Sequence, residues 1–271
     1  MPSLFQIDAF TSTLFAGNPA AVVPLSQALD AELMQRIAAE NNLSETAFFW
    51  PDSGTADFQL CWFTPQSEVE LCGHATLATA WLLQHELGWK APSISFSTRS
   101  GMLHAQAAPG GRVQIDLPAR PSQPATPPPA LLQGLNHEPE QILCGANWIC
   151  VYAQESDVHQ LQPVMEPLTR IGPHGVIATA PGSSVDFVSR YFVPAYGIDE
   201  DPVTGSAHCD LFPYWSARLH KEQLHARQLS ARGGELELSW KDAQRSRVLL
   251  SGDCRLYLRG SISLPDDTTA N

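Results

Sequence analysis

An internal repeat constrains the fold of this chain more than any other feature of its sequence. Residues 58–65 and 187–194 both read Phe, three further residues, an aromatic residue, Phe, a β-branched residue and Pro, and an Asp precedes each segment. An acidic stretch and then a glycine follow each of them, Gly73 in the first half and Gly205 in the second. Because these echoes recur in the same order, the sequence predicts two similar domains of roughly 120–130 residues each.

Strand patterns accompany the repeat in both halves. Residues 58–63 and 187–192 are rich in apolar and aromatic side chains, and residues 113–117 alternate between apolar and polar, as half-buried strands do. A fainter echo relates residues 17–23 to residues 145–151. Each half is therefore predicted to contain antiparallel strands.

Three helices are expected from the apolar patterns. Residues 75–83 are apolar on nearly every side, which is typical of a buried helix. Residues 211–219 look like its counterpart, although Pro213 should shorten or kink that helix because proline cannot donate the helical hydrogen bond. An amphipathic helix is predicted at residues 31–41.

The two glycines of the repeat predict a shared binding site. Gly73 and Gly205 each stand where a strand turns into a buried helix, and helix N-termini offer unpaired N–H groups and a positive dipole end. If the halves face each other across a pseudo-twofold axis, both N-termini point into one cleft. Such a cleft would hold a carboxylate or an enolate-like oxygen.

Residues 42–50 place a single carboxylate, Glu45, between hydroxyl side chains and a run of large apolar ones. A carboxyl group held against apolar walls has a raised pKa, because desolvation disfavours the charged form. Glu45 could then hold or return a proton near neutral pH, as a general acid or base does. Alternatively, Ser44 caps a helix and Glu45 is a solvated surface residue.

A proline-rich segment, residues 119–130, is predicted to be a semi-rigid linker between the halves. The predicted domains are therefore residues 1–118 and residues 131–264, followed by a polar tail at residues 265–271. In fold class, the chain is predicted to be α+β with two domains related by a pseudo-twofold axis.

The composition argues against several classes of function. A formal net charge of −12 disfavours a nucleic-acid partner, because phosphate backbones are bound by basic surfaces. The chain lacks an apolar run of about 18 or more residues that would predict a membrane span, and it lacks a secretory signal, so a cytoplasmic location is expected. Glycine-rich nucleotide-binding motifs are absent. The six cysteines do not have the spacing of a zinc site and are expected to be free thiols.

The ordered motifs resemble those of the PhzF family, the phenazine-biosynthesis-like isomerases, from near the first residue to about residue 260. The segments that carry the resemblance are residues 8–23, 42–47, 73–76 and 191–208. The resemblance implies a diaminopimelate-epimerase-like fold, in which each of two similar domains is a rolled antiparallel β-sheet around a central helix. It also implies an enzyme without cofactor or metal ion, commonly a homodimer, that acts on a small amino-acid-like substrate.

The resemblance further implies roles for individual residues. A glutamate matching Glu45 moves a proton between carbons of a small cyclic amino acid, and a histidine and an aspartate matching His74 and Asp201 assist it. Three positions match those at which the family holds its substrate through backbone N–H groups and a hydroxyl group: Gly73, Gly205 and Ser206.

Several of these residues also have a structural interpretation. His74 at a helix N-terminus would be a neutral imidazole that can relay a proton, because the helix dipole disfavours its cation. Asp201 could orient His74 or a substrate amine, or could simply face a helix dipole. Ser206 could cap its helix, and Asn18 could either bind substrate in the cleft or only form a turn.

Cys72 raises a second enzymatic hypothesis. Racemases and epimerases of this fold use two opposed thiols, each just before such a glycine, but here Cys72 in the first half corresponds to Thr204 in the second. A threonine hydroxyl is too weakly acidic to replace a thiol, so Cys72 is interpreted as a small buried residue of the cleft wall. The alternatives to an isomerase are an amino-acid racemase or epimerase, and a protein that only binds a small acidic metabolite. The sequence does not identify the substrate.

Overall fold

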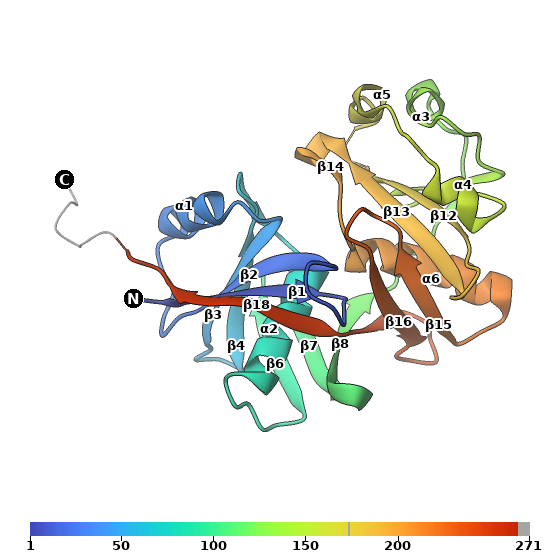
Figure 1. Ribbon diagram of the computed structural model, residues 1–271. Helices are drawn as coiled ribbons and strands as arrows, with labels where there is room; N and C mark the ends of the chain where they lie inside the picture. Colours follow the sequence, from blue (N-terminus) through green and yellow to red (C-terminus); the bar gives the residue numbers. More distant parts are fainter. Residues whose placement is uncertain (173, 265–271) are drawn as a thin grey trace.

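The computed structural model describes residues 1–172 and 174–264, so the predicted tail at residues 265–271 lies outside the described residues. Figure 1 shows two lobes, with helix α2 (Gly73–His85) in the first and helix α6 (Gly205–Leu219) in the second. Strands of both halves pack against these two helices. The predicted α+β class, with a central helix in each half, is confirmed.

The two halves of the chain have matching orders of elements. The first half consists of β1 (Ser3–Ala9), β2 (Asn18–Pro24), α1 (Ala31–Asn41), β3 (Glu45–Pro51), β4 (Phe58–Phe63), β5 (Glu68–Val69), α2, β6 (Ser93–Thr98), β7 (Gly101–Ala108) and β8 (Arg112–Pro118). The second consists of β10 (Gln141–Cys144), β11 (Trp148–Val151), α4 (Glu155–His159), α5 (Met165–Thr169), β12 (Val176–Pro181), β13 (Phe187–Val193), β14 (Ile198–Glu200), α6, β15 (Gln223–Gln228), β16 (Gly234–Trp240) and β17 (Arg247–Gly252). Further elements are β9 (Gln123–Pro124), α3 (Pro129–Gly134) and β18 (Cys254–Ser261).

Strand pairing repeats in the same order in the two halves. β2 is parallel to β3, and β11 is parallel to β12. β4 is antiparallel to β3 and parallel to β6, and β13 is antiparallel to β12 and parallel to β15. The halves join where β8 and β17, which are equivalent strands, pair antiparallel. This pattern confirms the repeat and adds parallel pairs to the antiparallel sheets that the sequence predicts.

The faint N-terminal echo falls on the equivalent strands β2 and β11, but with an offset of one residue. Ala21 of β2 pairs with Thr46, and Trp148 of β11 pairs with Val176. Thr46 and Val176 occupy matching positions opposite the last Phe of each repeat segment. The counterpart of Trp148 is therefore Ala21, whereas the sequence echo alone aligns Trp148 with Ala20.

The halves exchange one strand each. β9 follows the first half in sequence but pairs with β10 of the second, and β18 ends the second half but pairs with β1 of the first. The predicted linker at residues 119–130 thus contains a strand, and the end of the predicted domain 131–264 lies in the sheet of the first lobe. The domain boundaries stay a prediction. Boundaries drawn by strand pairing would assign β9 to the second lobe and β18 to the first.

Helices α1 and α2 match the apolar patterns that predict them. α1 covers the predicted residues. Its own residues Met34, Ile37 and Ala38 form its buried face, and the Asp30 side chain caps its N-terminus. In α2, every residue from 73 to 83 is buried, as expected for a helix that is apolar all round. This burial fixes the N-terminus of α2 deep in the molecule.

Helix α6 runs through Pro213 to Leu219, so of the two expected effects of this proline, a shorter or a kinked helix, the shortening does not occur. A proline at this position leaves the carbonyl of Cys209, four residues earlier, without its helical donor. The N–H group of Arg120, just after β8, donates to that carbonyl at 3.1 Å. The segment between the halves thereby satisfies the group that proline leaves unpaired. All six cysteines are free, as predicted.

Candidate active site

The N-termini of α2 and α6 meet at the boundary between the two halves. Gly73 and Gly205 begin these helices, and a Cβ atom added to Gly73 would lie 3.5 Å from the Cα of Gly205. Two sets of unpaired backbone N–H groups and two positive dipole ends therefore lie side by side. The sequence predicts this convergence, and an anionic group placed here would interact with both helices.

Glu45 is the first residue of β3 and lies near this point. Its side chain is 17% exposed, and desolvation raises the pKa of its carboxyl group to about 8, with a further contribution from the charge of Asp201. The alternative in which Ser44 caps a helix does not hold. Helix α1 ends at Asn41, Asn42 forms its left-handed C-cap at φ 49°, and Ser44 leads into the strand.

His74, the second residue of α2, faces Glu45. Its Nε2 lies 3.2 Å from Glu45 Oε2, and burial lowers the pKa of the imidazole to about 3, so the ring is neutral. Its Nδ1 lies 3.3 Å from the amide nitrogen of Asn18 and 3.5 Å from the thiol of Cys72. Because that amide nitrogen can only donate, we assign the ring proton to Nε2, the ring nitrogen on the side of Glu45.

Asn18 joins the two halves of the site. It is fully buried at the start of β2, and its Nδ2 donates to Asp201 Oδ1 and to the carbonyl of Val203, both at 2.9 Å. The same nitrogen contacts His74. Asn18 therefore links a histidine of the first half to an aspartate of the second, and Asp201 approaches His74 through Asn18.

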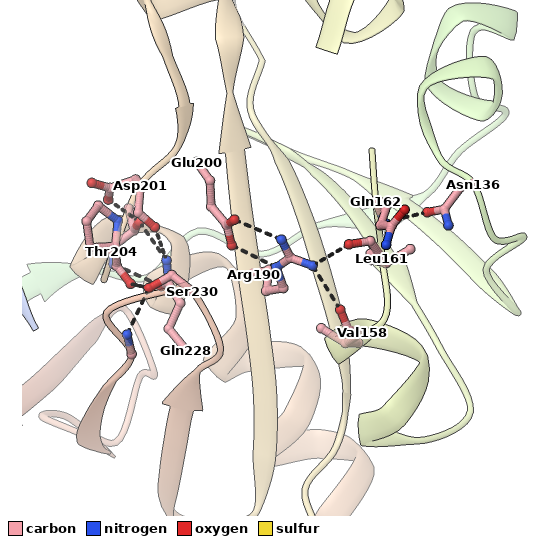
Figure 2. Close-up of polar contacts among 12 residues, drawn as sticks. Asn136, Val158, Leu161, Gln162, Arg190, Glu200, Asp201, Thr204, Gln228 and Ser230 are labelled. Atoms are coloured by element: carbon pink, nitrogen blue, oxygen red, sulfur yellow. Dashed lines mark hydrogen bonds and ion pairs between the residues drawn. The ribbon is translucent and has the colours of Figure 1, made fainter. Parts of the chain in front are cut away.

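Asp201 is held by several donors. The Thr204 hydroxyl and the Asn18 amide donate to its carboxylate, and both lower a pKa that burial raises to about 6. Its backbone is fixed as well, since its N–H donates to the carbonyl of Tyr191 at 3.0 Å and its carbonyl accepts from Gln228 Nε2 at 2.7 Å. Figure 2 shows Asp201 and Thr204 beside Gln228.

Residues with no recognisable motif support this segment. Gln228 Oε1 accepts from the N–H of Thr204 at 2.9 Å, and Ser230 Oγ donates to the carbonyl of Pro202 at 2.7 Å. Arg190 binds Glu200, next to Asp201, through two hydrogen bonds of 2.7 and 2.8 Å (Figure 2). Sequence reasoning missed these supporting residues, because they come from other strands and loops and carry no local pattern.

Three buried polar atoms in the site have no hydrogen-bond partner among the described residues: Asn18 Oδ1, Glu45 Oε2 and His74 Nε2. The contact between the last two is within ion-pair distance but lacks the alignment of a regular hydrogen bond. Buried polar groups are normally paired, so unpaired ones that cluster at one place indicate where a ligand binds.

Cys72 lies inside the site and not merely along its wall. Its thiol contacts His74 Nδ1, and burial together with the nearby Glu45 raises its pKa well above the ordinary value. The thiol is therefore neutral. Glu45, Cys72 and His74 each offer a ligand atom within 4.8 Å of the others, a mixed set that is chemically able to hold a divalent metal ion.

Ser206 occupies the position in α6 that His74 occupies in α2, namely the second residue of the helix. The N-cap position belongs to Thr204, so the capping interpretation of Ser206 is wrong. Thr204 makes no capping hydrogen bond with its side chain; its hydroxyl donates to Asp201 and accepts from Gln228 Nε2.

A pocket of 260 Å³ lies beside the site. It is lined from the first half by residues 42–44 and 64–66, and from the second half by residues 196–198. Ser44 in its lining directly precedes Glu45. The pocket lies next to the site in the chain, but Glu45, His74, Asn18 and Asp201 line neither this pocket nor the 570 Å³ groove around Arg112 and Glu237.

Glu45 has no acidic counterpart in the second half. Thr46 lies opposite Phe63, and Val176 lies opposite Phe192, so the residue that corresponds to Glu45 is Gly175. The fold thus supplies one acidic group from the first half and supporting groups from both. Together, fold and site define an enzyme class: isomerases built on the epimerase-like fold.

Comparisons with known proteins place the chain within this class. A family model described as phenazine biosynthesis-like protein, PhzC-PhzF, matches residues 7–260. An uncharacterized isomerase of Pseudomonas aeruginosa is 46% identical over 262 residues, which cover 97% of this chain and 99% of that protein. The chain belongs to the PhzC-PhzF family, and it is an enzyme of the isomerase type.

Solved structures agree with this assignment. The crystal structure of a PhzF-family phenazine biosynthesis protein from Enterococcus faecalis matches with a TM-score of 0.91 and 38% identity, over 97% of this chain and 99% of that chain. A predicted epimerase from Pseudomonas aeruginosa, at 21% identity, shares the fold with a TM-score of 0.76 over 98% of this chain and 100% of that chain. The predicted family and fold are therefore confirmed.

Proposed function

We propose that this chain is a cofactor-independent isomerase that moves a proton between two carbons of a small cyclic or amino-acid-like carboxylate, with Glu45 as the acid/base group. The position of Glu45 carries the proposal. Its carboxyl group is mostly buried, lies 3.2 Å from a neutral imidazole and has a pKa of about 8. A carboxyl group with this pKa can both accept and donate a proton near neutral pH.

The proposed reaction has two steps and conserves all atoms. Ionised Glu45 removes a proton from a carbon that is α or vinylogous to the substrate carboxylate, and the C–H electron pair moves into an enolate-like system. The protonated Glu45 then delivers the proton to a different carbon, which regenerates the carboxylate. The side-chain hydrogen bond with Cys72 lowers the pKa of Glu45 and so favours its ionised form during the first step, and His74 Nε2 lies 3.2 Å from Glu45 Oε2.

Backbone groups at the paired helix N-termini stabilise the negative charge that develops on the substrate. Gly73 and Gly205 let the two N-termini approach each other closely, because a Cβ atom on either residue would already touch the Cα of the other, at 3.5 and 3.6 Å. Ser206 would add a hydroxyl donor from the first turn of α6. Asp201 and the unpaired Oδ1 of Asn18 are acceptors that suit a substrate amine.

Two other functions remain to be tested. A racemase with two thiols is disfavoured because Thr204 occupies the position of the second thiol. The Thr204 hydroxyl donates a hydrogen bond to Asp201. A protein that only binds a small acidic metabolite would use the same site without exchanging any carbon-bound hydrogen.

The substrate class can be found by hydrogen exchange in deuterated water. Cyclic amino acids and amino-acid precursors of aromatic compounds are incubated with the protein, and mass spectrometry measures the deuterium that enters carbon positions. An isomerase incorporates deuterium and yields a product with a shifted double bond. Loss of chirality at the α-carbon without a shifted bond would support the racemase, and binding without exchange would support the binding protein.

The rate should depend on pH through Glu45. Because the pKa of its carboxyl group is raised to about 8, the group is mostly protonated at neutral pH. Proton removal requires the ionised form, so kcat/KM should rise about tenfold per pH unit below pH 8 and level off above it. A pH–rate profile with a substrate from the screen measures this. A profile that is flat from pH 6 to pH 9 would remove Glu45 as the base.

We further propose that the substrate is the main partner, that the enzyme is a cytoplasmic homodimer, and that it binds no nucleic acid. The homodimer rests on the family resemblance, and the lack of a nucleic-acid partner rests on the net charge of −12. Among the helices of residues 1–172 and 174–264, none is long and apolar enough to cross a membrane.

A further inference from the structure

The loop between β15 and β16, in the second half, contacts the residues that immediately precede Asn18. Arg232 lies between β15 and β16, and its guanidinium group forms three hydrogen bonds with the first half. Nε donates to the carbonyl of Gly17 at 2.8 Å, and Nη2 donates to the carbonyl of Ala16 at 3.0 Å and to Asp8 Oδ1 at 2.9 Å. These contacts fix the backbone immediately before Asn18.

The segment before Asn18 is strained and needs such support. Phe10 and Phe15 have φ angles of 62° and 68°, a region that residues with side chains rarely adopt. Gly17 has φ 70°, and a Cβ atom there would overlap with the carbonyl of Ala9. The second half holds this conformation, because Gly17 N–H donates to the carbonyl of Gly233 at 2.7 Å.

The same loop also contacts the segment that contains Asp201. Ser230 Oγ donates to the carbonyl of Pro202 and accepts from the N–H of Gly233 (Figure 2 shows Ser230 beside Thr204). The loop from residue 229 to residue 233 therefore holds Asn18 on one side and the Asp201 segment on the other.

We infer that Arg232 is a positioning residue for proton transfer that acts through Asn18. This inference rests on the proposed function of Glu45. Asn18 reaches His74, Asp201 and Val203 with a single nitrogen, so a small displacement of its backbone breaks contacts with both halves at once. Arg232 fixes that backbone with two donated hydrogen bonds, to Gly17 and Ala16, and donates a third to the side chain of Asp8, which is 1% exposed.

Two replacements of Arg232 separate positioning from charge. Arg232→Met removes all three hydrogen bonds and leaves the buried carboxylate of Asp8 without its cation, so both stability and rate should fall. Arg232→Lys restores a cation for Asp8, but a single ammonium nitrogen cannot reproduce the planar fork that reaches Gly17 and Ala16. The Lys variant should therefore regain much of the thermal stability and keep a kcat about 10–100-fold below that of the unchanged protein.

A double-mutant cycle with Asn18 tests the route of the effect. The exchange rate in deuterated water is measured for Asn18→Ala, Arg232→Lys and the double variant, each corrected for folded protein by circular dichroism. If Arg232 acts through Asn18, the double variant should be as slow as Asn18→Ala alone, because the second change removes nothing further. Arg227→Gln is the matched control, since Arg227 forms an ion pair with Glu235 in the same hairpin and is 36% exposed.

Two results would overturn the inference. One is a kcat of Arg232→Lys equal to that of the unchanged protein. The other is a double variant whose loss is the product of the two single losses. Failure of the proposed function is distinguishable, because then the unchanged protein would exchange no hydrogen, or Glu45→Gln would exchange as fast as it does.

Discussion

Replacing Glu45 with Gln should lower the rate of hydrogen exchange by about 10²–10⁴-fold, the range for removal of a general acid/base group. Gln has nearly the same shape as Glu but cannot take up or release a proton near neutral pH. The 3.2 Å contact with His74 Nε2 can persist, since the amide oxygen of Gln can occupy the position of Glu45 Oε2. The measurement is deuterium incorporation into a substrate from the screen, with circular dichroism to verify the fold.

The same variant should be more stable than the unchanged protein at alkaline pH. The carboxyl group of Glu45 has a pKa of about 8 in the folded chain and an ordinary value of 4.5. Its stabilising contribution is therefore fully present below pH 4.5 and is lost as the pH rises to 8, because ionisation costs more in the folded state. Each pKa unit corresponds to about 1.4 kcal/mol, so Glu45→Gln should gain a few kcal/mol above pH 8 and little below pH 4.5.

Glu40→Gln is the matched control for both measurements. Glu40 lies in the same part of the chain, near the end of α1, but its side chain is exposed. This variant should leave the exchange rate unchanged, and its stability profile is the baseline against which that of Glu45→Gln is compared. If Glu45→Gln retained full exchange, Glu45 would have no part in the reaction.

The fold was largely predictable because the repeat places aromatic residues and prolines in one register in both halves. Phe58–Phe63 is the observed strand β4, and the end of helix α1 matches its pattern. The exchange of β9 and β18 was not predictable, since β18 pairs with a strand about 250 residues earlier in the chain. Helix α6 continues through Pro213 because a distant N–H group, that of Arg120, replaces the missing donor.

The candidate site was predictable only where its residues belong to sequence motifs. Glu45, His74, Asp201 and Asn18 lie in recognisable motifs, and the structure brings these four side chains together. The residues that position them, such as Gln228 and Arg232, act largely through backbone groups, with carbonyls as the main acceptors. A carbonyl acceptor is present at every residue, so sequence alone gives no sign of which one an arginine or glutamine will bind.

The residue of the second half that corresponds to Glu45 is Gly175, and a side chain at this position should destabilise the protein. Gly175 is buried, and a Cβ atom there would overlap with the ring of Tyr191. That ring cannot simply move aside, because its hydroxyl donates to Asn147 Oδ1 at 3.0 Å and the Tyr191 backbone accepts from Asp201. Tyr191 thus fills the space in which a second acid/base side chain would stand.

Replacing Gly175 with Ala should lower the free energy of unfolding by about 1–3 kcal/mol, the usual cost of overpacking a core. Chemical denaturation measures this change, and Gly260→Ala is the control, because a Cβ atom at Gly260 would meet only Leu258, at 3.8 Å. Tyr191→Leu should remove most of the penalty, so that adding Gly175→Ala to it costs little. A full penalty in the Leu background would mean that Tyr191 is not what excludes a side chain at position 175, and the structural reason for a single acid/base group would be lost.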